Sequence, residues 1–225
     1  LAWLKNTLTT VTFDTSLPTS NDVIKRSAIF IKEKKMAKKN PNMSMKKKEN
    51  SPRIIGKSFI IDGLKQSINA SNSVSWRLLD FFSNHFSVSM GGQLMAGLAP
   101  TLEREAIAPN MLGNFEDMLL AVVKHPAMLL YLNNEKSFGP NSLVGKRAKK
   151  GMNENLAREI LELHTLGVNG GYSQTDVIEL AKGITGWSIN NKHKKGNLGF
   201  NYNKRAHEPG VRDFLGKKYP QKDIT

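Results

Sequence analysis

The stretch from Gly151 to Trp187 reads GMNENLAREILELHTLGVNGGYSQTDVIELAKGITGW, which is the pattern of two helices joined by a glycine-rich turn. Asn153 is a suitable N-cap for the first helix, and Gly167 stands where a glycine commonly ends one. Ser173 and Asp176 have the spacing of a capping box at the start of the second helix, with Asp in place of the usual Glu. The stretch therefore predicts helical structure on both sides of a tight reversal.

The first of these two helices, which we call the signature helix, has a polar and an apolar face. On a helical wheel of about 100° per residue, one arc of the surface carries all its charged and amide side chains. These polar residues are Glu154, Asn155, Arg158, Glu159, Glu162 and Thr165. His164 falls among the apolar residues, so we expect it to point toward the core.

The polar face has two interpretations. In the first, Glu154, Arg158 and Glu162 form an i,i+4 ladder on a solvated surface, with each pair contributing a few tenths of a kcal/mol. In the second, Arg158 and the carboxylates orient a ligand or a metal ion. Glu159 and His164 are about 140° apart on the wheel, so one regular helix cannot direct both at the same ion. We favour the ladder, because structural ion-pair networks resemble active sites in sequence.

Apolar stripes and turn residues predict further helices and little β structure. We expect helices starting at Asn21 or Asp22, at Ser73, at Asn114 and at Pro126, and others over Ile60–Ile68 and Thr101–Ala108, the last with Glu103, Arg104 and Glu105 outward; a short strand is expected at Phe200–Asn203. The predicted fold class is therefore mostly α: a multi-helix globular array with long irregular loops and at most a minor short β element.

Composition excludes several classes of protein. The chain has 225 residues, of which 39% are hydrophobic, and its 18 glycines add about 8%; the total of about 47% is in the ordinary globular range. It has no cysteine, and no apolar run approaches the roughly 20 residues that a membrane-spanning helix needs. The sequence contains no P-loop, dinucleotide fingerprint or Gly-x-Ser-x-Gly elbow, so no cofactor is identified. Because the chain opens on Leu1, we interpret it as a fragment or a processed form.

The net charge of +14 is concentrated in one segment. Between Lys25 and Lys57 there are twelve basic residues against two acidic ones, and Phe30 is the only aromatic residue that could stack on a base. Like-charge runs are usually solvated, so a lysine-rich connection or insertion is favoured over nucleic-acid binding. The chain thus divides into an N-terminal segment (1–24), this connection (25–57) and a helical core domain (58–225).

An enzyme remains a competing hypothesis. Its catalytic candidates are Asn84, His85, Asn155, Arg158, Glu159 and Glu162, gathered around one polar pocket; His85, Glu159 and Glu162 are weak candidates for metal ligands. His85 lies between two phenylalanines, at 82 and 86, and a lone histidine on an aromatic helix is more often a hydrogen-bonded core residue.

Several ordered motifs resemble the bacterial family known as domain of unknown function 1800. They are Ser83–Phe86 (SNHF), Glu103–Asn134, Gly139–Ser142 (GPNS), the stretch Gly151–Trp187, and His207–Tyr219, which contains HEPG and FLGKKY. The resemblance covers roughly Trp76–Tyr219. It implies a largely helical protein that is often made with an export signal, and a further C-terminal helical portion. It also implies frequent encoding beside members of another family, domain of unknown function 1501. The resemblance implies no established reaction, so it assigns no catalytic residue.

These observations favour a helical, exported bacterial protein that acts as a binding or assembly component with a protein partner, such as a neighbouring member of the 1501 family. The first alternative is an enzyme, metal-dependent or not, built on the signature helix. The second is binding of nucleic acid or an anionic surface through the lysine-rich segment. Neither the compartment nor the oligomeric state follows from the sequence.

Overall fold

The computed structural model describes residues 8–40, 48–190 and 199–221. It divides into two compact units, one made of residues 1–127 and 191–199, the other of residues 128–190 and 200–225. Helices dominate both units, and the strands form two small two-stranded sheets. The predicted mostly α fold class is confirmed. None of the described helices is both long and apolar enough to cross a membrane.

The first unit is built from helices. They are α2 (Ser20–Lys39), a 3₁₀ turn (Lys48–Asn50), α3 (Pro52–Asn69), α4 (Ser73–His85), α5 (Met95–Leu102), the π-helix η2 (Glu103–Ile107) and α6 (Phe115–Lys124), followed by α7 (Pro126–Tyr131), which crosses into the second unit. The proline-initiated start of α7 agrees with the sequence prediction.

The N-cap of α2 lies two or three residues before the predicted cap, Asn21 or Asp22. Thr19 is the N-cap, and its hydroxyl accepts a hydrogen bond from the backbone N–H of Asp22 while the Asp22 carboxylate accepts one from Thr19. Asp22 is therefore the third residue of a capping box. The helix continues to Lys39, so much of the predicted lysine-rich connection is helical.

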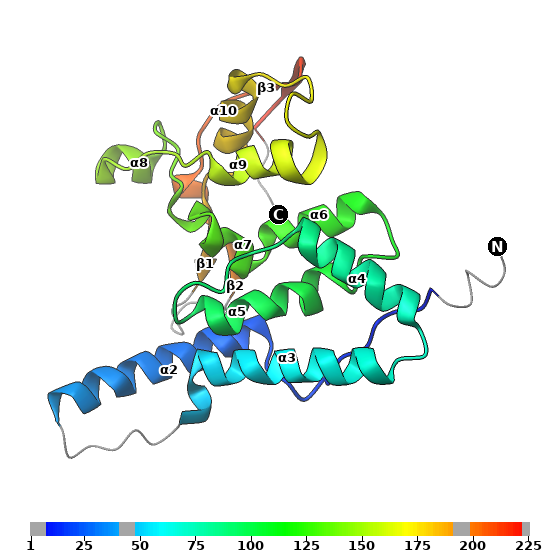
Figure 1. Ribbon diagram of the computed structural model, residues 1–225. Coiled ribbons are helices and arrows are strands. Elements are labelled where there is room, and N and C mark those ends of the chain that lie inside the picture. Colours follow the sequence, from blue (N-terminus) through cyan, green and yellow to red (C-terminus); the bar gives the residue numbers. More distant parts are fainter. Residues whose placement is uncertain (1–7, 41–47, 191–198, 222–225) are drawn as a thin grey trace. The chain divides into compact units, whose positions relative to one another are not determined.

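Helices α3 and α5 pack closely, as Figure 1 shows. Pro100 lies inside α5 and has no N–H to offer to the carbonyl of Ala96, four residues earlier. Gly56 of α3 sits against that carbonyl, and a Cβ at this position would be 2.0 Å from the Ala96 oxygen. Gly97 meets the backbone of Pro52 in the same way. The two helices can approach only because these positions lack side chains.

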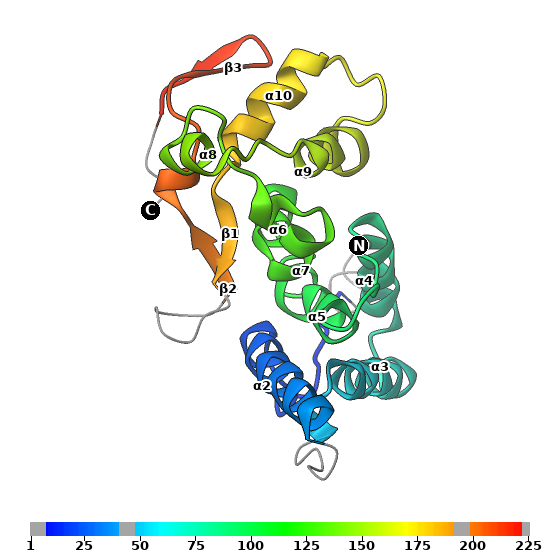
Figure 2. The ribbon, with the colours of Figure 1, turned by 90° about the vertical axis from the view of Figure 1, so that its left-hand side faces the viewer.

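The second unit combines short helices with both sheets. Its elements are η3 (Asn134–Lys136), α8 (Leu143–Ala148), α9 (Asn155–Glu159), the π-helix η4 (Ile160–Thr165), α10 (Gln174–Gly183), β1 (Trp187–Asn190), β2 (Gly199–Tyr202), η5 (Lys204–Ala206), β3 (Arg212–Phe214) and β4 (Lys217–Tyr219). In Figure 2, α10 lies beside α9 and the β3–β4 hairpin. Strand β2 matches the predicted short strand to within a residue.

The signature helix is not one regular helix. Its first turns, α9, are α-helical, and the remainder is the π-helix η4, in which Leu166 donates its N–H to Leu161 five residues earlier at 3.0 Å. A wheel of constant step is therefore wrong beyond Glu159. The side chain of His164 is nevertheless buried, as predicted. Gly167 follows with a φ of 84°, which suits a glycine at a helix end.

The hairpin formed by β3 and β4 was not predicted. Leu215 and Gly216 form its two-residue turn with φ values of 50° and 71°, as a type I′ turn requires. The Leu215 N–H donates to the Asp176 carboxylate at 2.7 Å, which ties the turn to the start of α10. The predicted capping box of Ser173 and Asp176 is confirmed, and Asp176 therefore serves both features.

Candidate functional site

Three consecutive charged residues at the start of η2 contact three different parts of the first unit. The sequence interpretation placed Glu103, Arg104 and Glu105 outward on a short α-helix; this is wrong for Arg104, whose side chain is 11% exposed, whereas Glu103 is half-buried and Glu105 is exposed. The segment is a π-helix, closed by a 2.8 Å hydrogen bond from Ala108 N–H to the Glu103 carbonyl, and it continues directly from α5. The three adjacent side chains project in different directions around this helix, so Glu103 reaches α4, Arg104 reaches α3 and Glu105 reaches the start of α2.

Arg104 forms a largely buried ion pair with Asp62 of α3. The Nη1–Oδ2 distance is 2.6 Å, and the two side chains are 11% and 8% exposed. The guanidinium also donates to the Asp14 carbonyl at 2.8 Å and lies over the rings of Phe13 and Phe59, 4.4 and 5.2 Å from their centres. Burial alone would raise the pKa of Asp62, but the hydrogen bonds from Arg104 and other donors hold it below its ordinary value.

Glu105 joins the start of α2 to the end of α6. One carboxylate oxygen accepts the Ser20 N–H at 2.6 Å, and the other lies 3.3 Å from His125 Nε2. His125 Nδ1 accepts the Ala127 N–H at 3.1 Å, so a proton on the ring is directed at Glu105. Burial acts to raise the pKa of Glu105, but the hydrogen bonds from His125 and Ser20 lower it below the usual value. His125 is thus a helix-junction residue with a carboxylate partner 20 positions away in the sequence.

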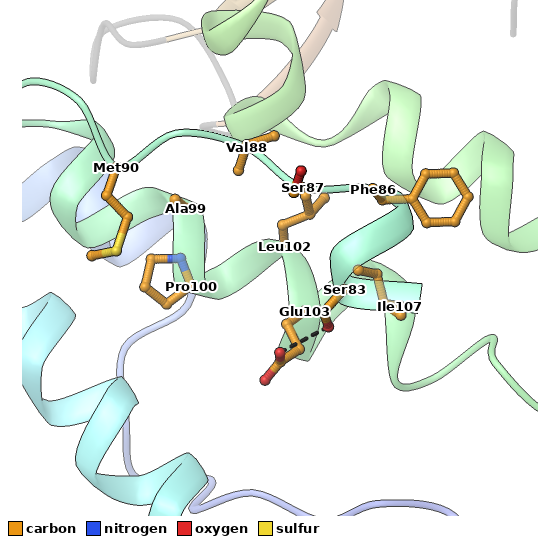
Figure 3. A pocket seen from close by; sticks show the side chains of 10 residues that line it. All are labelled: Ser83, Phe86, Ser87, Val88, Met90, Ala99, Pro100, Leu102, Glu103 and Ile107. Carbon is orange, nitrogen blue, oxygen red and sulfur yellow. Dashed lines mark hydrogen bonds between the residues drawn. The ribbon is translucent and has the colours of Figure 1, made fainter. Parts of the chain in front are cut away.

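Glu103 has the opposite electrostatic environment. Its carboxylate accepts a 2.8 Å hydrogen bond from the Ser83 hydroxyl of α4, drawn as a dashed line in Figure 3. Burial raises the pKa of Glu103, and the nearby charge of Asp80 raises it further. Two residues apart on one helix, Glu103 and Glu105 have pKa values displaced in opposite directions.

Two hollows meet at Glu103 and Pro100, which line both of them. The smaller, about 200 Å³, is mostly apolar and appears in Figure 3; its wall includes Val88, Met90 and Leu102. The larger, about 370 Å³, is lined by aromatic and acidic side chains of the N-terminal strand-like segment, α3, α4 and η2. The site that combines a perturbed carboxylate with a cavity therefore lies in the first unit, away from the signature helix in sequence.

The polar face of the signature helix forms the predicted ladder. Arg158 contacts Glu162 at 3.1 Å and Glu154 at 3.3 Å, and Gln174 of α10 accepts from Arg158 at 3.0 Å and donates to Glu154 at 2.9 Å. The Arg158 side chain is 41% exposed. An exposed, mutually paired network agrees with the structural interpretation of this face. Burial and the charge of Glu162 raise the pKa of Glu159.

The other candidate residues are divided between the two units. Asn84 and His85 end α4 in the first unit. The Asn84 amide donates to the Asp80 carbonyl at 2.9 Å, within its own helix. The His85 ring lies edge-on to Phe86 at 4.6 Å and parallel to Phe81 at 6.5 Å, in the aromatic surroundings that the sequence suggested. Asn155, like Arg158, Glu159 and Glu162, belongs to the second unit. A catalytic role for any of the six stays a prediction.

The described residues contain no group of three or more His, Asp or Glu side chains arranged to hold a metal ion. His85 belongs to the first unit, whereas Glu159 and Glu162 belong to the second. Their suggested role as metal ligands likewise remains a prediction.

Comparison with known proteins identifies the family. A family model described as "Protein of unknown function (DUF1800)" matches residues 2–224. The chain belongs to this family. The match extends beyond the motifs of Trp76–Tyr219 and spans the lysine-rich segment. No curated protein and no solved structure matches the chain.

Three of the motifs that carried the DUF1800 resemblance converge in the second unit. The buried Glu208 carboxylate of HEPG accepts the backbone N–H of Asn141 at 2.8 Å and its side-chain amide at 2.6 Å. The Glu208 N–H donates to the Thr185 hydroxyl at 2.8 Å. A Cβ at Gly139 of GPNS would lie 2.5 Å from the Glu208 backbone. These motif residues therefore hold three loops together, which accounts for them structurally.

Proposed function

We propose that this DUF1800 protein is a binding component of a protein assembly and that the outer face of α3 is its docking surface. The observation that carries the proposal is a row of exposed apolar side chains. The exposed fractions run from 48% for Ile54, through Ile61 and Leu64, to 79% for Ile68. We call these four residues the α3 outer face.

The spacing of the α3 outer face is that of a helix–helix contact. Ile54, Ile61 and Ile68 recur every seven residues, and Leu64 follows Ile61 by three, which are the a and d positions of a heptad. The opposite side of α3 already buries apolar residues such as Ile55 against the rest of the unit. A helix that is apolar on two sides needs a second covering surface, and a contiguous exposed apolar row marks an interaction site.

The charges beside the α3 outer face favour one kind of partner. Arg53, Lys57 and Lys65 lie on the exposed side of the helix, whereas the acidic residue of α3, Asp62, is buried in its pair with Arg104. A second copy would bring the same basic residues against one another. The complementary partner is an amphipathic helix of another protein with acidic residues flanking its apolar stripe.

Site-specific photocrosslinking in cells that make the full-length protein tests this proposal. A photoreactive residue at Ile61 is expected to yield one discrete adduct that contains a different protein. The matched control is Leu143 of α8, whose side chain is 68% exposed outside the docking surface; it should give no such adduct. The absence of an adduct at Ile61, the same adduct at both positions, or an adduct made only of two copies of this chain would overturn the proposal.

The resemblance supports two finer proposals. We infer that the protein is bacterial and exported, and that a neighbouring member of the 1501 family is the first partner to test; purifying that neighbour and measuring its binding to wild type and to Ile61→Glu would test the pairing. The enzyme and anionic-surface alternatives gain no specific support. The polar face of the signature helix is an exposed ion-pair ladder and not an enclosed pocket. Residues 25–39 of the basic segment belong to helix α2, and this alone does not favour an anionic ligand.

A further inference from the structure

The larger of the two hollows that meet at Glu103 has an aromatic floor and an acidic rim. Its volume is about 370 Å³. The side chains that line it include Phe13, Phe59, Trp76, Asp80, Glu103 and Arg104. This volume is ample for a small organic group. The proposed docking at the α3 outer face does not explain what this hollow does.

The aromatic rings are held rigidly in place. Trp76 and Phe59 are buried, and Phe13 meets Trp76 edge-to-face with ring centres 5.4 Å apart. Arg104 is stacked against Phe13 and Phe59 while paired with Asp62. The floor is therefore pre-formed, and its one cation is already neutralised by its own carboxylate.

The two carboxylates of the rim lack such neutralisation. Glu103 accepts a hydrogen bond from Ser83, a neutral group. Within the described part of the chain, no ion pair involves Asp80 or Glu103. Burial and the negative charge of Asp80 raise the pKa of Glu103, and the Ser83 hydrogen bond and the charge of Arg104 offset this only in part.

We propose that this hollow binds a primary alkylammonium group. The ammonium would donate charge-assisted hydrogen bonds to Glu103 and Asp80 at the rim, while its alkyl chain would lie against the aromatic floor. Such a ligand removes the repulsion between the two carboxylates. A metal ion fits less well, because aromatic carbon supplies no ligand atoms and the carboxylates here number two. An anion would meet the acidic rim unfavourably.

Two sources could supply this group. One is a free alkylamine, and the other is a lysine side chain on another protein. Leu64 belongs both to the hollow and to the α3 outer face, so a docked helix could place a lysine here. The chemistry of the hollow does not depend on that docking, and the two proposals can fail separately.

The test is a titration of the full chain with n-butylammonium chloride, followed by NMR, with n-butanol as the uncharged control. We expect saturable binding of the amine and weaker binding of the alcohol. Because a hydrogen bond to a charged group contributes about 1.5–3 kcal/mol, Glu103→Gln should weaken amine binding about tenfold or more. Glutamine preserves the size of the side chain, and circular dichroism verifies that the variant is folded.

Glu116→Gln on α6 is the matched control, since Glu116 is an exposed carboxylate that does not line the hollow. It should bind n-butylammonium like the wild type. Equal affinities for amine and alcohol, or an affinity unchanged by Glu103→Gln, would overturn the proposal. N-acetyl-lysine N-methylamide separates the two sources: its binding supports a protein lysine, and its exclusion, with n-butylammonium still bound, supports a free amine.

Discussion

Replacing Arg104 by leucine should destabilise the first unit strongly. The substitution removes the 2.6 Å pair with Asp62 and leaves that carboxylate 8% exposed, with the Asp14 N–H at 3.1 Å and the Gln66 amide at 3.1 Å as its remaining donors. A buried charge that has lost its ionic partner is more costly than the pair was favourable, because its desolvation is no longer compensated.

The expected loss can be estimated from these contacts. Breaking a buried ion pair from one side costs about 3–5 kcal/mol, and the slight exposure of both side chains places this pair near 3 kcal/mol. Loss of the two guanidinium–ring contacts adds about 0.5–1 kcal/mol each. The free energy of unfolding should therefore fall by roughly 4 kcal/mol, a large part of the 5–15 kcal/mol that is typical of a folded protein.

Urea unfolding at pH 7, followed by circular dichroism, measures this change. The decisive control is the double variant Asp62→Leu/Arg104→Leu, which carries no buried unpaired charge. It should be about 1–2 kcal/mol more stable than Arg104→Leu alone, despite containing one more substitution. A single variant that loses less than about 1 kcal/mol, or a double variant whose loss is the sum of the two single losses, would refute this account of the pair.

Four further predictions rest on the packing and the pKa displacements. Gly56→Ala puts a methyl group 2.0 Å from the Ala96 carbonyl oxygen and should lower the free energy of unfolding by about 1–3 kcal/mol or more. Gly63→Ala on the same helix has open space around it and should raise the free energy of unfolding by roughly 0.5–1 kcal/mol. Thermal unfolding compares the two variants. Glu105 has a lowered pKa, so its contribution to stability is present above the usual value of 4.5 and is lost as the pH falls through the lowered value. Glu105→Gln should therefore be less stable than wild type at pH 7, and the difference should shrink in acid. Glu103 has a raised pKa, so the wild type loses stability as the pH rises from 4.5 through that raised value, and Glu103→Gln should gain stability relative to wild type over this range. Urea unfolding at several pH values measures both variants. A pH dependence of the same sign for Glu103→Gln and Glu105→Gln would contradict the opposite pKa displacements of the two carboxylates. Gly139→Ala places a methyl group 2.5 Å from buried backbone atoms and should loosen the second unit, seen as faster proteolysis of its loops, while unchanged protection would argue against the close packing.

Local features of this fold could be predicted because they depend on residues a few positions apart. The capping box of Ser173 and Asp176, the proline-initiated helix at Pro126 and the glycine at the end of the signature helix follow from hydrogen bonds and backbone preferences within one turn. The Arg158 ladder was predictable for the same reason, since i,i+4 neighbours meet on any helix surface. The β3–β4 hairpin was missed because its turn is Leu-Gly rather than the Asn-Gly or Asp-Gly that signals such turns.

The tertiary structure determines which charged residues form buried ion pairs and long-range hydrogen bonds. The sequence alone marked a helical protein of a recognisable family and directed attention to the polar face of the signature helix. It offered no reason to pair Arg104 with Asp62, which is 42 positions away, or Glu105 with the start of α2, 85 positions away. Those partners depend on how α2, α3 and α4 pack around η2, a π-turn whose three adjacent charged side chains contact three different elements. The energies that select such a turn are the buried ion pairs and hydrogen bonds themselves, and these form only when distant segments meet.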